Sequence, residues 1–174
     1  MEWRAMFVDY CPDRLANMDP LHPFENMWDQ DDEACKRIEY SMQAIRENYE
    51  KFMTFYDQFF LHTKDKYTSQ NFDTICGREG IDGFVCGSDT IFCYKEFGFD
   101  DGYFANYDVM RNGYSVAYAA SFGDTDLRSI DKEALKAKLR NFRYLALREN
   151  QFLDFTREAT EVKVEQVIDP TLLL

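Results

Sequence analysis

The stretch Asp82-Gly-Phe-Val-Cys-Gly-Ser-Asp89 decides the fold that the sequence predicts. Its apolar run stops at Gly87, and Ser88 and Asp89 follow immediately. A short apolar run bounded by glycine is typical of a strand buried in a parallel sheet. In such a sheet, ligands lie beyond the carboxyl ends of the strands, where small and acidic residues can contact them. The stretch therefore predicts a strand that ends at a ligand-binding edge.

Two further apolar runs end in the same way. Tyr114–Ala120 is followed by Ser121-Phe-Gly123, and Tyr144–Leu147 is followed by Arg148-Glu149. Strands that alternate with helices predict an α/β fold, with a Rossmann-like open parallel sheet flanked by helices. The remaining elements are expected at residues 131–141 (helix), 149–160 (helix) and 164–168 (strand).

The amino-terminal part is expected to contain a short strand at 5–8, a loop at 13–32 and a long helix at 32–60. The apolar residues of this helix recur at alternating steps of four and three, which places them along one face. They are Ile38, Met42, Ile45, Tyr49, Phe52, Tyr56 and Phe59. Because a coiled coil has the same spacing, two interpretations stay open: a helix laid across its own sheet, or a helix that binds a partner helix.

No linker divides the chain, which predicts one domain over 1–174.

Two connecting segments have less regular patterns. Residues 68–75 predict a short helix capped by Thr68 or Ser69. Residues 90–112 are rich in Phe, Tyr and Gly and predict a packed loop with little regular structure. Aromatic rings at this density usually pack on one another, although they can also stack on sugar rings.

Charge and composition exclude several classes of partner. The 174 residues include 20 Lys and Arg against 32 Asp and Glu, a formal net charge of -12. This charge repels phosphate backbones and anionic lipids, so nucleic acids and membrane surfaces are not expected partners. Five cysteines without a C-x-x-C pair, no spanning segment and no signal peptide predict a cytoplasmic protein.

Known catalytic motifs and metal-ligand spacings do not occur in the sequence. His22 and His62 lie in predicted loops without the spacing of a metal site, so we expect surface residues and no metal. There is no glycine-rich phosphate loop. Ser88 is not a nucleophile elbow, because the glycine two positions after it is missing.

Polar residues at the three strand ends are the candidate binding residues: Ser88, Asp89, Ser121, Gly123, Arg148 and Glu149. Asp89 is also the candidate catalytic residue. For Ser88 and Asp89 the alternative role is to cap the following turn. Arg148 leaves a buried strand, where a guanidinium can bind phosphate or carboxylate. Its alternative role is an ion pair with Glu149 or a neighbouring acid.

Five segments occur in the order found in polysaccharide pyruvyl transferases, and the chain resembles that family from about residue 5 to residue 174. The segments are Phe84-Val-Cys-Gly-Ser-Asp89, Tyr103-Phe-Ala105, Ser115-Val-Ala-Tyr-Ala-Ala-Ser-Phe-Gly123, Leu147-Arg-Glu149 and Asp169-Pro-Thr-Leu-Leu-Leu174. Each segment alone is weak evidence, whereas five in the same order favour the family strongly.

The resemblance implies one half of a GT-B-type fold, in which two Rossmann-type halves face each other across a cleft. Members move the pyruvyl group of phosphoenolpyruvate onto two hydroxyls of a sugar as a ketal and release phosphate. Phosphoenolpyruvate is then the donor substrate, and no cofactor is implied. By this resemblance Ser88 and Asp89 line the cleft on the side of the sugar acceptor, Ser121 and Gly123 form part of its floor, and Arg148 contacts the anion.

The chain also differs from the family pattern. Members usually have Gln and Trp at the positions of Thr90 and Phe92. They usually begin one strand earlier and continue into a second half, which carries most donor-binding basic residues and the presumed acid histidine. Neither His22 nor His62 corresponds to that histidine. The resemblance thus implies an amino-terminal-half-like fragment that is inactive alone and that can self-associate through exposed apolar surface. The alternative is a non-catalytic α/β binding or interaction module, with the helix at 32–60 as its contact surface.

Overall fold

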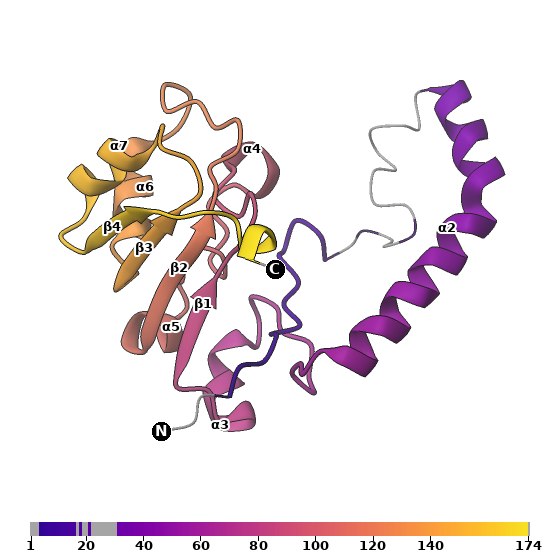
Figure 1. The fold of residues 1–174 in the computed structure, drawn as a ribbon, viewed down its shortest axis with the longest axis horizontal. Helices are drawn as coiled ribbons and strands as arrows, with labels where there is room; N and C mark the ends of the chain where they lie inside the picture. Colours follow the sequence, from indigo (N-terminus) through magenta and orange to yellow (C-terminus); the bar gives the residue numbers. More distant parts are fainter. Residues whose placement is uncertain (1–3, 17, 19–20, 22–30, 174) are drawn as a thin grey trace. The chain divides into compact units, whose positions relative to one another are not determined.

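The computed structural model describes residues 4–16, 18, 21 and 31–173. The chain consists of two compact units, Met1–Tyr67 and Thr68–Leu174 (Figure 1). The prediction of one domain over 1–174 stays a prediction.

The first unit contains one long helix, α2, which spans Asp32–Phe59. The Asp31 carboxylate begins the helix by accepting hydrogen bonds from the backbone N–H groups of Glu33 and Ala34, which have no partner within the helix. The backbone becomes extended at Phe60, where the helix ends. The predicted helix at 32–60 is therefore confirmed.

The apolar face of α2 is largely uncovered. Among the side chains of the helix only Ile38 is buried, whereas Phe52, Phe55 and Phe59 are all at least half exposed. The predicted spacing is present, but the burial that would accompany a helix packed along its whole length is not.

The strand predicted at 5–8 is wrong. Phe7 and Tyr10 each form an isolated parallel bridge, to His62 and Tyr67 respectively, rather than a ladder of hydrogen bonds. The apolar residues of this segment give it the sequence pattern of a strand, but in the structure they serve packing. The Phe7 ring packs on the Phe60 ring with centroids 4.9 Å apart. Of the predicted loop at 13–32, residues 13–16 form a turn, and most of the rest lies outside the described residues.

The two histidines were expected at the surface. The His62 side chain is 32% exposed, and its ring stacks on Tyr56 with centroids 4.9 Å apart. Its Nε2 lies 3.5 Å from the carboxylate of Asp57. His22 lies outside the described residues.

The second unit is built on a four-stranded sheet. Its strands are β1 (Gly83–Cys86), β2 (Tyr114–Ala120), β3 (Tyr144–Leu147) and β4 (Lys163–Gln166). All pair in parallel in the order β1-β2-β3-β4. The connections after β2 and β3 contain α6 (Lys132–Leu139) and α7 (Leu153–Ala159). The predicted α/β fold with a Rossmann-like parallel sheet and flanking helices is confirmed.

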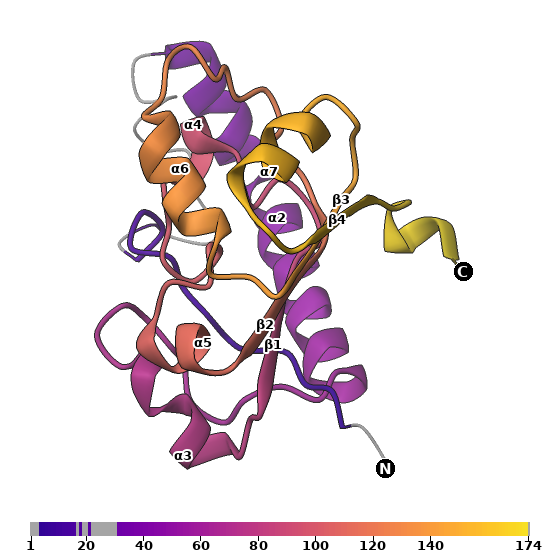
Figure 2. The ribbon, with the colours of Figure 1, turned by 90° about the vertical axis from the view of Figure 1, so that its left-hand side faces the viewer.

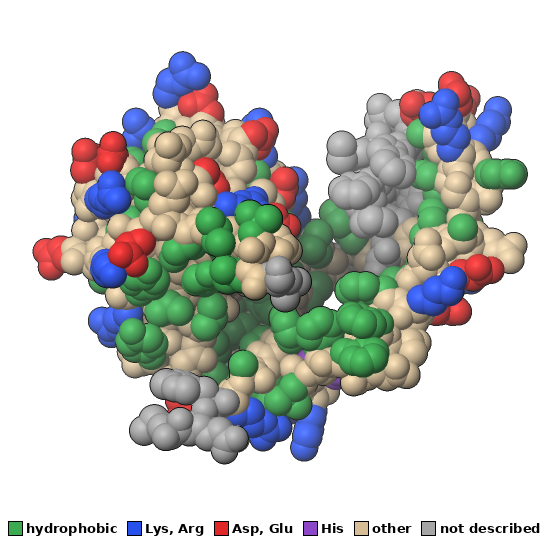
Figure 3. Space-filling view, in the orientation of Figure 1, with side chains coloured by type: hydrophobic (Ala, Val, Ile, Leu, Met, Phe, Trp, Pro, Cys, Tyr) green, Lys and Arg blue, Asp and Glu red, His purple; other side chains and the backbone are tan. Residues whose placement is uncertain are grey.

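The two faces of this sheet differ. The aligned residues Cys86, Ala117, Leu145 and Val164 are all buried. Strands placed in sequential order with right-handed crossovers put their helices on one face, and Figure 2 shows α6 and α7 on the same side of the sheet. On the other face, hydrophobic side chains remain visible over the strands (Figure 3). Val85 there is 69% exposed.

The connecting segments contain more helix than predicted. The segment 90–112, expected to be mostly irregular, includes α4 (Tyr94–Phe97) and α5 (Asp108–Asn112). The helix expected near Thr68 begins later, as a 3₁₀ turn η1 (Phe72–Thr74) that continues into α3 (Ile75–Glu79). The aromatic residues of segment 90–112 pack internally, as expected: Phe92 stacks on Phe104 at 4.6 Å between centroids.

No described helix is long and apolar enough to cross a membrane. None of the five cysteines forms a disulfide bond. Burial raises the pKa of the Cys86 thiol to about 12, so this group stays protonated and packs as an apolar side chain.

Candidate functional site

Three strand ends form the candidate site, at the carboxyl edge of the sheet. All four strands run in one direction (Figure 1). The residues that follow β1, β2 and β3, namely Ser88, Asp89, Ser121 and Arg148, therefore come to the same edge. The backbone N–H of Ser121 donates to the Asp89 carbonyl at 2.9 Å, and that of Arg148 donates to the Ala120 carbonyl at 3.1 Å. The structure therefore connects the ends of β1, β2 and β3, as the sequence predicted.

The backbone after β1 has a conformation that few residues adopt. Gly87 has a φ of 131°, and the Gly87–Ser88 peptide bond is cis. A Cβ atom on Gly87 would lie 2.0 Å from the carbonyl oxygen of Tyr118, so no other residue fits there. Asp89 follows with a φ of 77°, in the left-handed region that Asp and Asn tolerate better than most residues. The Asp89 side chain, which lies beyond the strand, is exposed.

The turn after β2 is held by two of the predicted residues. The Ser121 side chain is buried, and its Oγ accepts a hydrogen bond from the Gly123 N–H at 3.0 Å. Glu149 accepts a hydrogen bond from the Phe122 N–H at 2.7 Å. Gly123 has a φ of 55°, and a Cβ there would lie 3.2 Å from the Cys93 sulfur. Ser121 and Glu149 thus hold the backbone of the turn by hydrogen bonds. Gly123 allows this turn to pack closely against Cys93.

Arg148 provides a positive charge at this edge. Its Nη1 donates to Asp169 Oδ2 at 2.9 Å, and its Nη2 lies 3.6 Å from Asp89 Oδ1. The hydrogen bond to Asp169 and the nearby charge of Asp89 raise the pKa of the guanidinium. The predicted ion pair of Arg148 therefore exists, with Asp169 and Asp89 rather than with Glu149 as hydrogen-bond or ion-pair partners.

The sequence placed Asp169 at the end of a predicted strand and in one of the five family segments but not among the candidate site residues, and it did not predict Lys95 as part of this region. Asp169 follows β4 and lies in an Asp-Pro-Thr turn, a local pattern in which the carboxylate caps the next residues. This pattern was a usable signal. Lys95 forms an ion pair with Asp124, next to Gly123. No local signal reveals Lys95, since its place depends on how the segment between β1 and β2 folds.

Acid titration tests the role of Asp169. Hydrogen bonds from Thr171, followed by Arg148, lower the pKa of Asp169 from 3.8 to about 2. A group whose pKa is lower in the folded protein stabilises it above the unfolded pKa, and this contribution disappears as pH falls toward the folded pKa. Asp169→Asn should therefore lower the free energy of unfolding by a constant amount above about pH 5.

The difference from wild type should then shrink between about pH 4 and pH 2, as measured by urea unfolding at each pH. The matched control is Asp154→Asn, which removes a carboxylate of α7 whose side chain is 93% exposed. A difference between wild type and Asp169→Asn that stays the same down to pH 2 would contradict the pKa assignment.

The residues that replace the family's Gln and Trp have structural partners. Thr90 Oγ1 donates to Glu96 Oε2 at 3.1 Å. Phe92 is only 1% exposed and packs in the core of the second unit. Phe92 is thus not available to stack on a sugar, whereas the carboxylate of Asp89, three residues earlier, is exposed.

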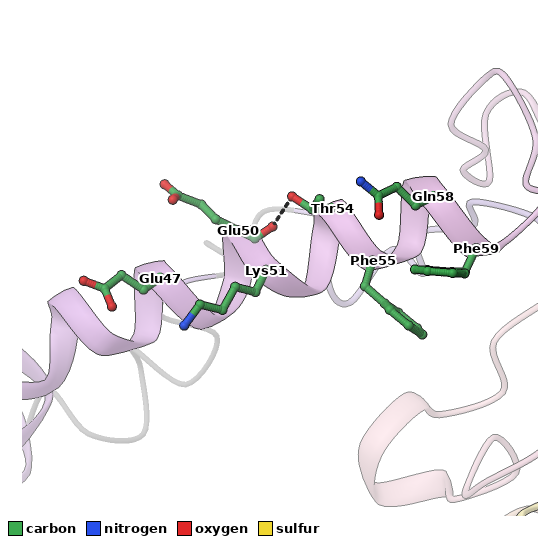
Figure 4. Close-up of a pocket in the computed structure, with 7 residues that line it drawn as sticks. All are labelled: Glu47, Glu50, Lys51, Thr54, Phe55, Gln58 and Phe59. Atoms are coloured by element: carbon green, nitrogen blue, oxygen red, sulfur yellow. Dashed lines mark hydrogen bonds between the residues drawn. The ribbon is translucent and has the colours of Figure 1, made fainter.

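A separate hollow of about 520 Å³ lies along α2 (Figure 4). Its lining comes from this one helix: Glu47, Glu50, Lys51, Thr54, Phe55, Gln58 and Phe59. Side chains of one helical face lack an opposing wall, so this surface does not enclose a small substrate. Among the described residues, no group of three or more His, Cys, Asp or Glu side chains is placed to hold a metal ion.

A family model described as polysaccharide pyruvyl transferase matches residues 11–174. The match includes all strands of the sheet and all six predicted site residues. No curated protein and no solved structure is significantly similar to the chain.

Proposed function

The chain belongs to the polysaccharide pyruvyl transferase family, and from that premise we propose that it takes part in moving the pyruvyl group of phosphoenolpyruvate onto a sugar of a polysaccharide or glycoconjugate as a ketal. One observation carries the proposal: a guanidinium, Arg148, and an exposed carboxylate, Asp89, lie together at the carboxyl edge of a parallel sheet. This edge is where such sheets bind ligands. The donor is an anion, which the guanidinium of Arg148 can bind. The acceptor offers hydroxyls, to which the carboxylate of Asp89 can form hydrogen bonds.

The reaction sets the requirements for the site. A proton adds to the methylene carbon of phosphoenolpyruvate and turns it into a methyl group, which leaves an oxocarbenium-like centre at the carbon that bears the phosphate. Two C–O bonds to sugar hydroxyls form at that carbon, and the C–O bond to phosphate breaks. One hydroxyl proton replaces the proton used in the first step, and the other leaves with inorganic phosphate. Atoms and charge therefore balance without an oxidant or a cofactor.

Arg148 can stabilise the negative charge in this reaction. Its guanidinium matches the geometry of a carboxylate or a phosphate, and it keeps its charge at every working pH. Such a cation contributes most when charge grows on the departing phosphate. We assign Arg148 to the donor on this ground, with Gly123 and the buried Ser121 shaping the floor beside it.

Asp89 suits the acceptor. Its side chain is 78% exposed and ends near the guanidinium, so a sugar hydroxyl can reach it. An ionised carboxylate can orient that hydroxyl and accept its proton as the C–O bond forms. Ser88 precedes it in the sequence and offers a hydroxyl as a second polar group. The acid that protonates the methylene carbon is not a histidine of Thr68–Leu174, because that segment contains none.

Phosphate release tests the proposal. The complete gene product should release phosphate from phosphoenolpyruvate when a galactoside or mannoside acceptor with two suitably placed free hydroxyls is present. The same acceptor with those hydroxyls blocked as an acetal is the matched control and should give none. No release with any acceptor in the panel would count against the transferase.

Residues 1–174 on their own should give no release. The family resemblance implies a second half that contributes basic residues and an acid histidine, and we propose that turnover requires it. Measurable turnover by residues 1–174 alone would overturn this requirement. We also propose that the reaction takes place in the cytoplasm, where phosphoenolpyruvate is made and where cysteines stay without disulfide bonds, as the five cysteines here are.

A second candidate function, self-association through α2, is supported by the exposure of its aromatic side chains. Phe52 and Phe59 are 62% and 68% exposed, and they belong to the face with heptad spacing. We expect Phe52→Ser/Phe59→Ser to lower the average mass measured by light scattering at high concentration. Tyr40→Ser is the matched control, since Tyr40 is an aromatic residue that is 93% exposed but lies on the opposite side of the helix from Ile38. A wild-type protein that stays monomeric at every concentration would contradict this function.

A further inference from the structure

Arg148 lies between two carboxylates that differ in how firmly they are held. Asp169 has a side chain that is 20% exposed, and it accepts a hydrogen bond from Arg148 Nη1 at 2.9 Å. Asp89 is 78% exposed, and its Oδ1 lies 3.6 Å from Arg148 Nη2. A separation of 3.6 Å is an ion pair but is too long for a direct hydrogen bond. Nη1 of Arg148 is therefore held by a hydrogen bond, whereas Nη2 has only a longer ion-pair contact.

The orientation of Asp169 is fixed by its own turn. Its Oδ1 accepts hydrogen bonds from the Thr171 backbone N–H at 3.0 Å and from the Thr171 hydroxyl at 2.7 Å. The Leu172 N–H donates to the Asp169 carbonyl at 3.0 Å and closes the turn. Pro170 lies between them, and its ring restricts the backbone that Asp169 caps. Oδ1 is thus occupied, and Oδ2 remains directed to Arg148.

We propose that Asp169 is a positioning residue for the donor site: it holds Nη1 of Arg148 so that the Nη2 edge of the guanidinium receives the donor anion, which displaces Asp89 from that edge. The proposal rests on the proposed function for the identity of the anion. A long arginine side chain loses much rotamer freedom when it binds a ligand. An anchor that orders it beforehand removes part of that cost.

The effect of removing the Asp169 charge on donor binding distinguishes a purely electrostatic role of this carboxylate from a positioning role. Both carboxylates repel an incoming anion, so on electrostatic grounds the removal of either charge would tighten donor binding. If Asp169 positions Arg148, loss of its charge should instead weaken binding, although one negative charge fewer is present. The two substitutions are therefore expected to act in opposite directions.

Calorimetric titration with phosphoenolpyruvate, and separately with inorganic phosphate, measures this contrast. Asp169→Asn should weaken the binding of phosphoenolpyruvate about tenfold or more, the size expected for a hydrogen bond between two charged groups. Thr171→Val removes the hydroxyl that holds Asp169 but keeps the backbone N–H, and it should weaken binding by a smaller factor. Asp89→Asn should tighten binding about threefold, because an exposed charge pair is disrupted. Asparagine also tolerates the positive φ of this position.

The order of the Arg148 side chain gives a second readout that needs neither ligand nor activity. Nitrogen-15 relaxation of the Arg148 Nε–H group should show a rigid side chain in wild type and in Asp89→Asn, and a mobile one in Asp169→Asn. A variant that merely lost stability would bind less without this selective change. The free energy of unfolding of each variant, from urea titration, separates the two cases.

The outcomes distinguish the two proposals. Equal binding by wild type and Asp169→Asn, or an Arg148 Nε–H that stays rigid without Asp169, overturns the positioning role and leaves the transferase proposal in place. Wild-type protein that binds neither anion overturns the transferase site and the displacement of Asp89 together. Weaker binding by Asp169→Asn with tighter binding by Asp89→Asn supports the positioning role.

Discussion

Gly87→Ala should destabilise the protein by at least about 3 kcal/mol, the largest effect on stability that we expect from a single substitution. The added Cβ would lie 2.0 Å from the carbonyl oxygen of Tyr118, which belongs to the neighbouring strand β2. Neither backbone can move away without breaking the pairing of β1 with β2. A φ of 131° adds a further cost for any residue other than glycine. Urea unfolding followed by far-UV circular dichroism measures the effect.

Substitutions of two other glycines separate the cost of the steric clash at Gly87 from the cost of its positive φ. Gly80 has a φ of 67° but open space around it, so Gly80→Ala should cost only about 1 kcal/mol. Gly77 has open space and lies within the helix α3, so Gly77→Ala should be neutral or slightly stabilising. If Gly87→Ala cost no more than Gly80→Ala, the close packing at the end of β1 would be disproved.

Arg148→Ala should raise the KM for phosphoenolpyruvate about 10- to 100-fold in the active enzyme, since a charge-assisted contact to an anion is lost. The KM for the sugar acceptor should change much less, because Arg148 is assigned to the donor. Arg148→Lys keeps the charge but not the fork of donors, and it should fall between wild type and Arg148→Ala. Steady-state kinetics with each substrate varied in turn measures the difference.

Arg143→Ala is the matched control for this prediction. Arg143 is exposed just before β3, at the opposite end of the strand that Arg148 follows. A general loss of positive charge would raise the donor KM in both variants, whereas a contact at the carboxyl edge would raise it only in Arg148→Ala. An unchanged donor KM in Arg148→Ala would remove Arg148 from the site.

Local sequence was sufficient to predict the strands of the sheet. The runs Phe84–Cys86 and Tyr144–Leu147 are apolar along their whole length and are ended by glycine or charged residues. The run Tyr114–Ala120 is apolar apart from Ser115 and is ended by Ser121, so the limits of all three are encoded in neighbouring residues. The parallel order then follows from the alternation with helices, and it brings Asp89 and Arg148 to one edge. For the same reason α2 was predicted with nearly correct ends, since Asp31 provides its cap.

Features that depend on distant partners were not predicted. The segment 5–8 has the pattern of a strand, but its outcome depends on residues near His62 and Tyr67, which provide single bridges only. The helices α4 and α5 have only four and five residues, which is too short for helical periodicity to show in the sequence. Asp169 is 21 residues from Arg148, and nothing in the local pattern shows that this acid, rather than Glu149, receives the guanidinium.

The most direct test of the donor site is an NMR titration of nitrogen-15-labelled protein with phosphoenolpyruvate. We expect the largest shifts at the Arg148 Nε–H group and at the backbone amides of Ser88, Asp89 and Gly123, with saturation at a single binding constant. The α2 amides beside the hollow of Figure 4 should not move. Shifts that are absent from the carboxyl edge of the sheet, or that occur only along α2, would contradict the assignment of this edge to the donor.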